Sequence, residues 1–167
     1  DRTIGTQMKA TGEVMAIDRS FEAALQKAVR SLEQGGRSLL WEDPSWKGGS
    51  REDVLGRLRK LIAVPNDLRL WALMAALRRD VDPMEIHRIS GIDPFFISKL
   101  ANLVSMERRL LGEKMTRSLM WDAKRLGFSD VQIGTLADLL PEQVRALRLG
   151  WGIRPVYKMV DTCAAEF

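Results

Sequence analysis

The side chains that could carry out acid–base or nucleophilic chemistry are few and lie far apart in the sequence. His87 is the only histidine and Cys163 the only cysteine among the 167 residues. A lone imidazole with no orienting partner nearby in sequence is typical of a packing or surface residue. The carboxylates of Asp161 and Glu166 near the cysteine disfavour a thiolate, so we expect an inert thiol. The sequence excludes, within this chain, a site that needs two imidazoles, an internal disulfide or a cysteine-rich zinc site.

The glycines and methionines offer no binding motif. Gly48, Gly49 and Ser50 are followed by Arg51, without the spacing or the lysine of a phosphate-binding P-loop. The eight methionines are spread along the chain, mostly on apolar helical stripes, where methionine fills core space. We therefore expect the chain itself to contain no catalytic residue, no cofactor-binding residue and no metal ligand.

Composition and charge indicate a globular protein with a mixed surface. Hydrophobic residues make up 46% and charged residues 29%, with a net charge of +4 and a pI near 9.5. The basic pairs Arg78-Arg79 and Arg108-Arg109 stand apart, and acidic residues such as Asp80 and Glu107 are interspersed along the chain, which indicates a mixed, solvated surface rather than a nucleic-acid-binding face. No apolar run reaches the roughly 18 residues of a membrane span, and residues 1–5 lack the apolar region of a signal peptide. We therefore expect no membrane partner and a cytoplasmic location.

Helix start signals and apolar periodicity predict an all-α protein of about eight helices in two small subdomains. The strongest start is Asp82-Pro83-Met84-Glu85, which combines a capping aspartate, a first-turn proline and a glutamate three residues after the cap. Residues 6–17 indicate a loop plus a short strand, residues 35–50 an irregular crossing with two tryptophans, and the tail from residue 156 an extended segment. The expected helices begin at Ser20, Ser50, Asn66 or Asp67, Asp82, Asp93, Thr116, Ser129 and Pro141.

A shift of 47 residues aligns two parts of the chain. Asp82 falls on Ser129 as a helix cap, Pro94 falls on Pro141 as a first-turn proline, and the apolar positions between them agree. We predict a duplicated unit, about residues 67–104 and 114–151, in which each copy buries one apolar face against its neighbour. Any two helix–turn–helix units share part of this pattern, so chance similarity is the alternative.

The helix pair at residues 131–148 is also similar in pattern to a helix–turn–helix, and a nucleic-acid-binding module is the alternative function. A recognition helix presents Arg, Asn, Gln or Ser near its start. Here that position carries Glu142, which phosphates repel, and the first unit begins with the apolar Phe95 and Phe96 after Pro94. The pattern favours packing over base reading, so we expect no nucleic-acid partner.

The two ends carry a family resemblance. Residues 8–17 (MKATGEVMAI) resemble the segment that closes the first ATP-grasp half of the carbamoyl-phosphate synthetase large subunit, and residues 155–167 (PVYKMVDTCAAEF) resemble the segment that opens its second half. Residues 21–32, 92–96 and 127–130 are similar to the region between those halves. Residues 35–65 match poorly, and Asp18 stands where the family usually has glycine. The chain thus resembles the central connection, or oligomerisation, domain of this glutamine-dependent family.

The resemblance implies a division of the chain and a role. Residues 1–18 would end the first ATP-grasp half, residues 19–152 would form the helical connection domain, and residues 153–167 would begin the second half. The parent is a ligase that makes carbamoyl phosphate from bicarbonate, glutamine-derived ammonia and two ATP, with Mg or Mn, for arginine and pyrimidine biosynthesis. The connection domain carries no ATP, metal or effector site in the family, so this piece alone is expected to be inactive.

The same resemblance implies partners and one site residue. The expected partners are the two flanking halves, the parent's glutaminase small subunit and, in a second role, another copy of the chain. Glu13 matches a glutamate near the internal passage for the intermediate, so it either borders that passage or only orders the domain boundary. The neighbours of residues 1–17 and 155–167 would lie in the flanking halves, so we expect low hydrogen-exchange protection there.

Overall fold

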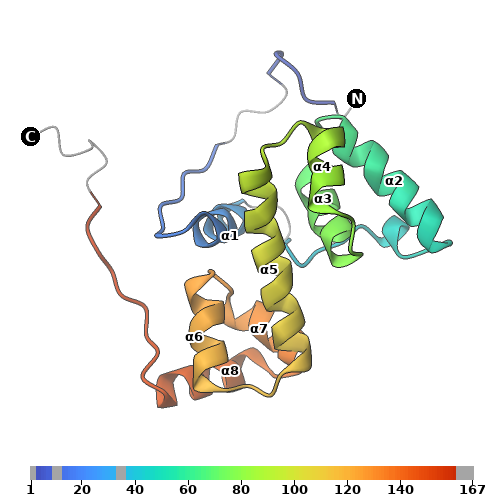
Figure 1. Ribbon diagram of the computed structural model, residues 1–167. Helices are drawn as coiled ribbons and strands as arrows, with labels where there is room; N and C mark the ends of the chain where they lie inside the picture. The colour runs from blue at the N-terminus through green and yellow to red at the C-terminus, as the bar shows by residue number, and fades with distance from the viewer. Residues whose placement is uncertain (1–2, 9–12, 33–36, 161–167) are drawn as a thin grey trace, which may run out of the picture.

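The computed structural model describes residues 3–8, 13–32 and 37–160 (Figure 1). These residues form eight α-helices and one short 3₁₀-helix, which confirms the predicted all-α class. The short strand expected within residues 6–17 is wrong for the described positions there, because this segment has no strand partner; residues 9–12 lie outside the described residues. The helices are α1 (Phe21–Ser31), η1 (Pro44–Trp46), α2 (Arg51–Ala63), α3 (Arg69–Arg78), α4 (Pro83–Ser90), α5 (Pro94–Gly112), α6 (Arg117–Arg125), α7 (Asp130–Ala137) and α8 (Pro141–Gly150).

Local capping explains where most helices begin. The side chains of Ser20, Asp82 and Thr116 each accept a hydrogen bond from a backbone N–H of the first turn, as their sequence positions predict. α3 differs, because Leu68 precedes it without a side-chain cap. Asn66 instead closes the turn between α2 and α3 by accepting from the Leu68 N–H at 2.9 Å.

A continuous hydrophobic core joins the two helical clusters. In Figure 1, α2, α3 and α4 lie around one end of α5, and α6, α7 and α8 lie around the other. The 19 residues of α5 therefore serve both clusters, with Leu103 and Leu110 about 1% exposed. Burying a large apolar side chain of this kind contributes roughly 1.5–3 kcal/mol. The most deeply buried side chains on the flanking helices are Leu58, Ile62, Met74 and Ile86 in the first cluster and Leu119, Met120, Ile133 and Val144 in the second.

The backbone carries the same special conformations at positions 47 residues apart. Asp80 and Gly127 both have positive φ, 60° and 87°, and so do Gly91 and Asp138, at 67° and 53°. After each of the first two, the next residue donates a 3.1 Å hydrogen bond to the carbonyl five residues before it. The common origin of the two units stays a prediction, but their turns have the same geometry.

Candidate functional site

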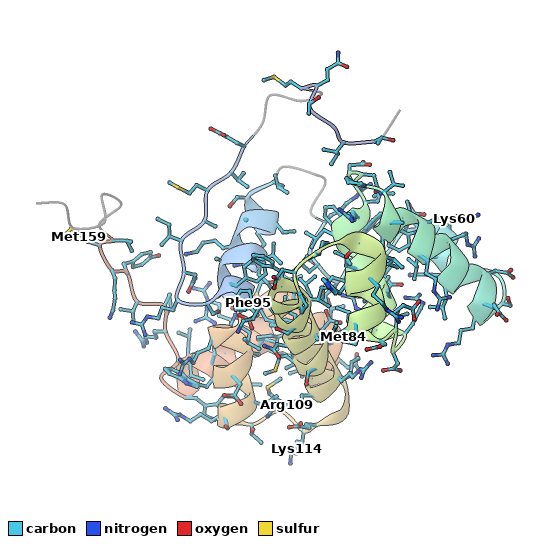
Figure 2. All side chains as sticks on the ribbon, turned by 45° about the horizontal axis from the view of Figure 1, so that its top comes forward. Lys60, Met84, Phe95, Arg109, Lys114 and Met159 are labelled. Carbon is cyan, nitrogen blue, oxygen red and sulfur yellow. The ribbon has the colours of Figure 1, made fainter. Side chains whose placement is uncertain are left out.

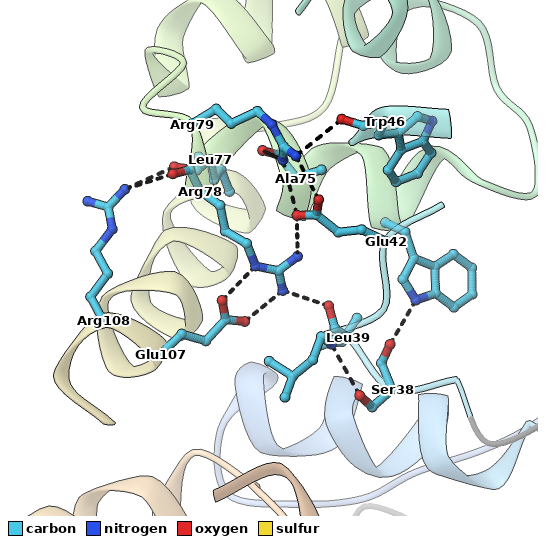
Figure 3. A network of polar contacts seen from close by, with 12 residues as sticks. Ser38, Leu39, Glu42, Trp46, Ala75, Leu77, Arg78, Arg79, Glu107 and Arg108 are labelled. Atoms are coloured by element: carbon cyan, nitrogen blue, oxygen red, sulfur yellow. Dashed lines mark hydrogen bonds and ion pairs between the residues drawn. The ribbon is translucent and has the colours of Figure 1, made fainter. Parts of the chain in front are cut away.

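Residues 37–47, the crossing segment, are anchored by buried ion pairs to α3 and α5 (Figure 3). Arg78 donates from Nε and Nη2 to the two carboxylate oxygens of Glu107, at 2.6 and 2.8 Å. Its Nη1 donates to Glu42 at 3.1 Å, and Nη2 also donates to the Leu39 carbonyl at 2.7 Å. Arg79 donates to the other oxygen of Glu42 at 2.8 Å. Two neighbouring arginines at the C-terminal end of α3 thus fix both the crossing segment and the C-terminal half of α5.

Hydrogen bonds and opposite charges keep this network ionised despite its burial. The side chains of Arg78 and Glu107 are 18% and 5% exposed. Burial alone would raise the pKa of Glu42, but hydrogen bonds and charge from Arg79 and Arg78 outweigh it and hold that pKa below its ordinary value. Burial likewise opposes the charge on Arg78, yet Glu107 and Glu42 raise its pKa. Both oxygens of the Glu42 carboxylate and both oxygens of the Glu107 carboxylate accept hydrogen bonds from arginine. This arrangement suits a positioning role rather than proton transfer.

The buried network corrects one expectation from the sequence. Arg78, Arg79 and Glu107 were expected on a solvated surface, because charged residues are interspersed around them. The structure instead buries Glu107 and covers the arginines with the crossing segment. The partners are 29 to 37 residues apart in sequence, so no local pattern could reveal the pairing.

Aromatic side chains hold the same segment against α3. The indole Nε1 of Trp71 donates to the Ser38 carbonyl at 3.0 Å. Trp41 lies edge-on to both Trp71 and Trp46, with ring centroids 6.0 Å apart in each case. The irregular crossing predicted from its glycines and tryptophans is therefore an ordered part of the core.

Buried glutamines and a glycine fix α1 against the second cluster. Gln26 donates to the Leu126 carbonyl at 3.0 Å and accepts from the Gln132 amide at 2.7 Å. At Gly127 a Cβ would lie 2.9 Å from the Cα of Ala23, so only glycine allows this approach. Sequence reasoning missed both glutamines. The one available signal was the spacing of Gln132 from Ser129, which forms a capping box.

The residues singled out for chemistry lie apart and have structural roles. His87 is half-buried, with Nδ1 2.8 Å from the Ile92 carbonyl in the turn between α4 and α5. Ser50 caps α2, and Gly49 has a φ of 98° in the preceding turn. Glu13 is exposed ahead of α1. Cys163 lies outside the described residues. No group of three or more His, Cys, Asp or Glu that could hold a metal ion occurs among the residues that the structure describes.

The two helix starts that would read bases in a helix–turn–helix carry acidic and apolar side chains. Glu142 is exposed at the start of α8, as the sequence indicates. Phe95 and Phe96, at the start of α5, are 54% and 43% exposed and present apolar rings. Phosphate oxygens prefer Lys, Arg and backbone N–H donors, none of which these side chains supply. In the described part of the chain, no helix is long and apolar enough to cross a membrane.

Comparison with known proteins identifies the family. The family model described as carbamoyl-phosphate synthetase large chain, oligomerisation domain, matches residues 13–152. The chain belongs to this family. It is 53% identical over 167 residues to the carbamoyl phosphate synthase large chain of Thermomicrobium roseum and 52% identical over 167 residues to that of Thermoanaerobacter sp. strain X514. It spans 15% of the length of each of these relatives.

A third relative is shorter. The carbamoyl phosphate synthase large chain, N-terminal section, of Methanopyrus kandleri is 42% identical over 185 residues, which cover all of this chain and 31% of that protein. The comparisons agree with the family resemblance, and nothing in them favours the nucleic-acid-binding alternative.

Proposed function

We propose that this oligomerisation domain holds the two ATP-grasp halves of a glutamine-dependent carbamoyl-phosphate synthetase in fixed relative positions. The observation that carries the proposal is the continuous core along α5, which makes one body of both helical clusters and the crossing segment. An unstable intermediate survives transfer between two sites only where its path excludes water, so the fixed geometry of the halves is itself a catalytic contribution. A packed helical body supplies this geometry, whereas a flexible linker does not.

The reaction of the parent would take place outside this domain. The flanking halves would use two ATP, with Mg or Mn, and bicarbonate, and the glutaminase small subunit would supply ammonia. The carbamoyl phosphate would serve arginine and pyrimidine biosynthesis in the cytoplasm. The saturated carboxylates of Glu42 and Glu107 support this division of labour, because both are occupied in holding the domain together.

The boundaries of the domain belong to the same proposal. Residues 1–18 would end the first half, residues 19–152 would form the connection, and residues 153–167 would begin the second half. Glu13 would border the passage for the intermediate; its exposure at the proposed boundary leaves the carboxylate free to face a neighbouring domain. The alternative role, ordering the boundary, predicts a loss of stability without a loss of coupling when Glu13 is replaced by glutamine.

Self-association is the second role we propose. The family is described as an oligomerisation domain, and several large apolar side chains are exposed on the helices. Met84 and Phe95, at the starts of α4 and α5, are 51% and 54% exposed (Figure 2). Sedimentation of the full-length protein, with Phe95→Glu as the variant and Lys60→Glu as the control, measures whether this surface contributes.

The positioning role is tested by the ATP consumed per carbamoyl phosphate formed. In the full-length protein, residues 19–152 are replaced by a flexible Gly-Ser linker. The control carries the same linker inserted between Lys47 and Gly48, in an exposed loop of the intact domain. We expect the ratio to rise well above two in the replacement and to stay near two in the control. A ratio of two in both proteins would contradict the positioning role.

A further inference from the structure

One face of α6 is open where the corresponding face of α3 is covered. Met74 on α3 is fully buried, whereas Trp121, 47 residues later on α6, is 45% exposed. Arg78 is covered by the crossing segment and paired with two carboxylates, whereas Arg125, again 47 residues later, is exposed. Within residues 3–8, 13–32 and 37–160, the first cluster therefore has a covering segment and the second has none at this face.

The open face forms one side of a cationic cavity of about 320 Å³. Trp121 and Ile153 supply apolar walls, and the polar lining includes four cationic side chains: Lys124, Arg125, Arg148 and Arg154. A volume of this size accommodates a few side chains of a peptide segment. The cavity lies where the chain leaves α8, because Ile153 and Arg154 belong to the tail.

Among the described residues, a single carboxylate pairs with two of these four cations. Asp130 pairs with Lys124 at 2.5 Å and with Arg148 at 2.9 Å. Burial alone would raise the pKa of Asp130, but hydrogen bonds and charge from these two cations outweigh it and lower that pKa. Burial lowers the pKa of Lys124, and the pair with Asp130 only partly offsets this effect. Arg125 and Arg154 make no ion pair with any residue that the structure describes. With four cations and one carboxylate, the cavity has an excess of three positive charges.

We propose that this cavity is the docking site for an extended, carboxylate-bearing segment of the half that follows this domain. The first cluster shows what such a cover looks like, because Trp41 packs on α3 while Glu42, next to it, binds Arg78 and Arg79. Arg125 and Arg154 would bind a carboxylate in the same manner, with apolar contact to Trp121. The first residues of the tail, Ile153, Arg154 and Pro155, line the cavity, and the later part of the described tail runs away from α6 and α8 (Figure 1). The inference rests on the proposed function, in which the second half begins at residue 153 and continues beyond residue 167.

The test is zero-length cross-linking in the full-length protein. Arg125→Lys and Arg154→Lys keep the charge and provide primary amines, which carbodiimide joins only to carboxylates in direct contact. The expected product links each position to an Asp or Glu beyond residue 167 of the same polypeptide. Arg145→Lys, at an exposed position of α8 outside the cavity, is the control and should give no such product. Adding Arg154→Glu to Arg125→Lys should reduce its cross-link by about tenfold, because one attractive charge becomes repulsive.

Other outcomes overturn the inference. These are a cross-link from position 125 to Asp161 or Glu166, a cross-link to a second copy, or the absence of any cross-link. Protection of residues 153–156 by added inorganic phosphate in the 167-residue chain, without protection in the full-length protein, would assign the cavity to a small anion instead. The failure of this inference is distinguishable from the failure of the proposed function. If no cross-link forms but the linker replacement raises the ATP ratio above two, only the docking proposal fails. If the linker replacement keeps the ratio at two, the positioning role fails as well.

Discussion

Replacing Glu107 with glutamine should cost about 3 kcal/mol of unfolding free energy, as the network around Arg78 implies. The Glu107 side chain is 5% exposed and accepts two hydrogen bonds from Arg78. Glutamine keeps the shape but turns an amide N–H toward guanidinium donors. One charge-assisted hydrogen bond is lost, at roughly 1.5–3 kcal/mol, and a buried donor is left unpaired, at roughly 1–3 kcal/mol. The sum agrees with the roughly 3–5 kcal/mol lost when one partner of a buried pair is removed.

The matched control is Glu85→Gln, which also removes a carboxylate paired with an arginine on another helix. Glu85 accepts a 2.6 Å hydrogen bond from Arg59, but the two side chains are 28% and 44% exposed. Water replaces the lost partner at such a site, so this variant should lose less than about 1 kcal/mol. The two variants make the same chemical change and differ in burial.

Urea unfolding followed by far-UV circular dichroism measures both variants. With a slope of about 2 kcal/mol per molar urea, the midpoint should fall by about 1.5 M for Glu107→Gln and by less than about 0.5 M for Glu85→Gln. A double variant, Arg78→Met with Glu107→Leu, should recover much of the loss, because it leaves neither of these two partners unpaired. Equal, small shifts for both glutamine variants would refute the reasoning, since burial would then make no difference.

Three further predictions concern glycine positions, the pH dependence of stability and nucleic-acid binding. Gly127→Ala should lower the unfolding free energy by about 2 kcal/mol or more, because the new Cβ would lie 2.9 Å from the Cα of Ala23 in α1, at a φ of 87°. Gly56→Ala, in α2 with no atom near the new Cβ, should raise the unfolding free energy by about 0.5–1 kcal/mol. Thermal unfolding should therefore show a lower midpoint for the first variant and a higher midpoint for the second. The lowered pKa of Glu42 means that its stabilisation is fully present above the ordinary value of 4.5 and is lost as pH falls through the lower folded-state pKa. The unfolding free energy should therefore decline below about pH 4, and decline less steeply in Glu42→Gln. A gel-shift titration at low salt with random duplex DNA should show no retardation; a salt-dependent shift would revive the nucleic-acid alternative.

The parts of the fold that the sequence predicts are those set within one or two helical turns. Helix starts are predictable at Ser20, Asp93 and Ser129, because each of these side chains accepts a hydrogen bond from a backbone N–H two or three residues later. The expected strand near the N-terminus was wrong for the residues described there, since a strand needs a partner that local sequence does not specify. The contacts of Gln26 with Gln132 lie 106 residues apart. No spacing rule reaches that far, and a glutamine gives no local sign of whether it will be buried.

The candidate site was harder to predict than the fold for a related reason. Arg78 and Arg125 occupy corresponding positions, and both stand among charged neighbours in the sequence. Their environments differ because the crossing segment brings Glu42 to one and no described residue brings a carboxylate to the other. Features shared at the 47-residue spacing, such as the positive-φ turns and the caps, build each cluster. Features that differ between the clusters reflect the different segments that each cluster packs against. Comparing the two clusters therefore helps to distinguish residues that build a cluster from residues that contact a covering segment. On this argument, Glu107→Gln should act chiefly on stability, and Arg125→Glu chiefly on coupling between the halves.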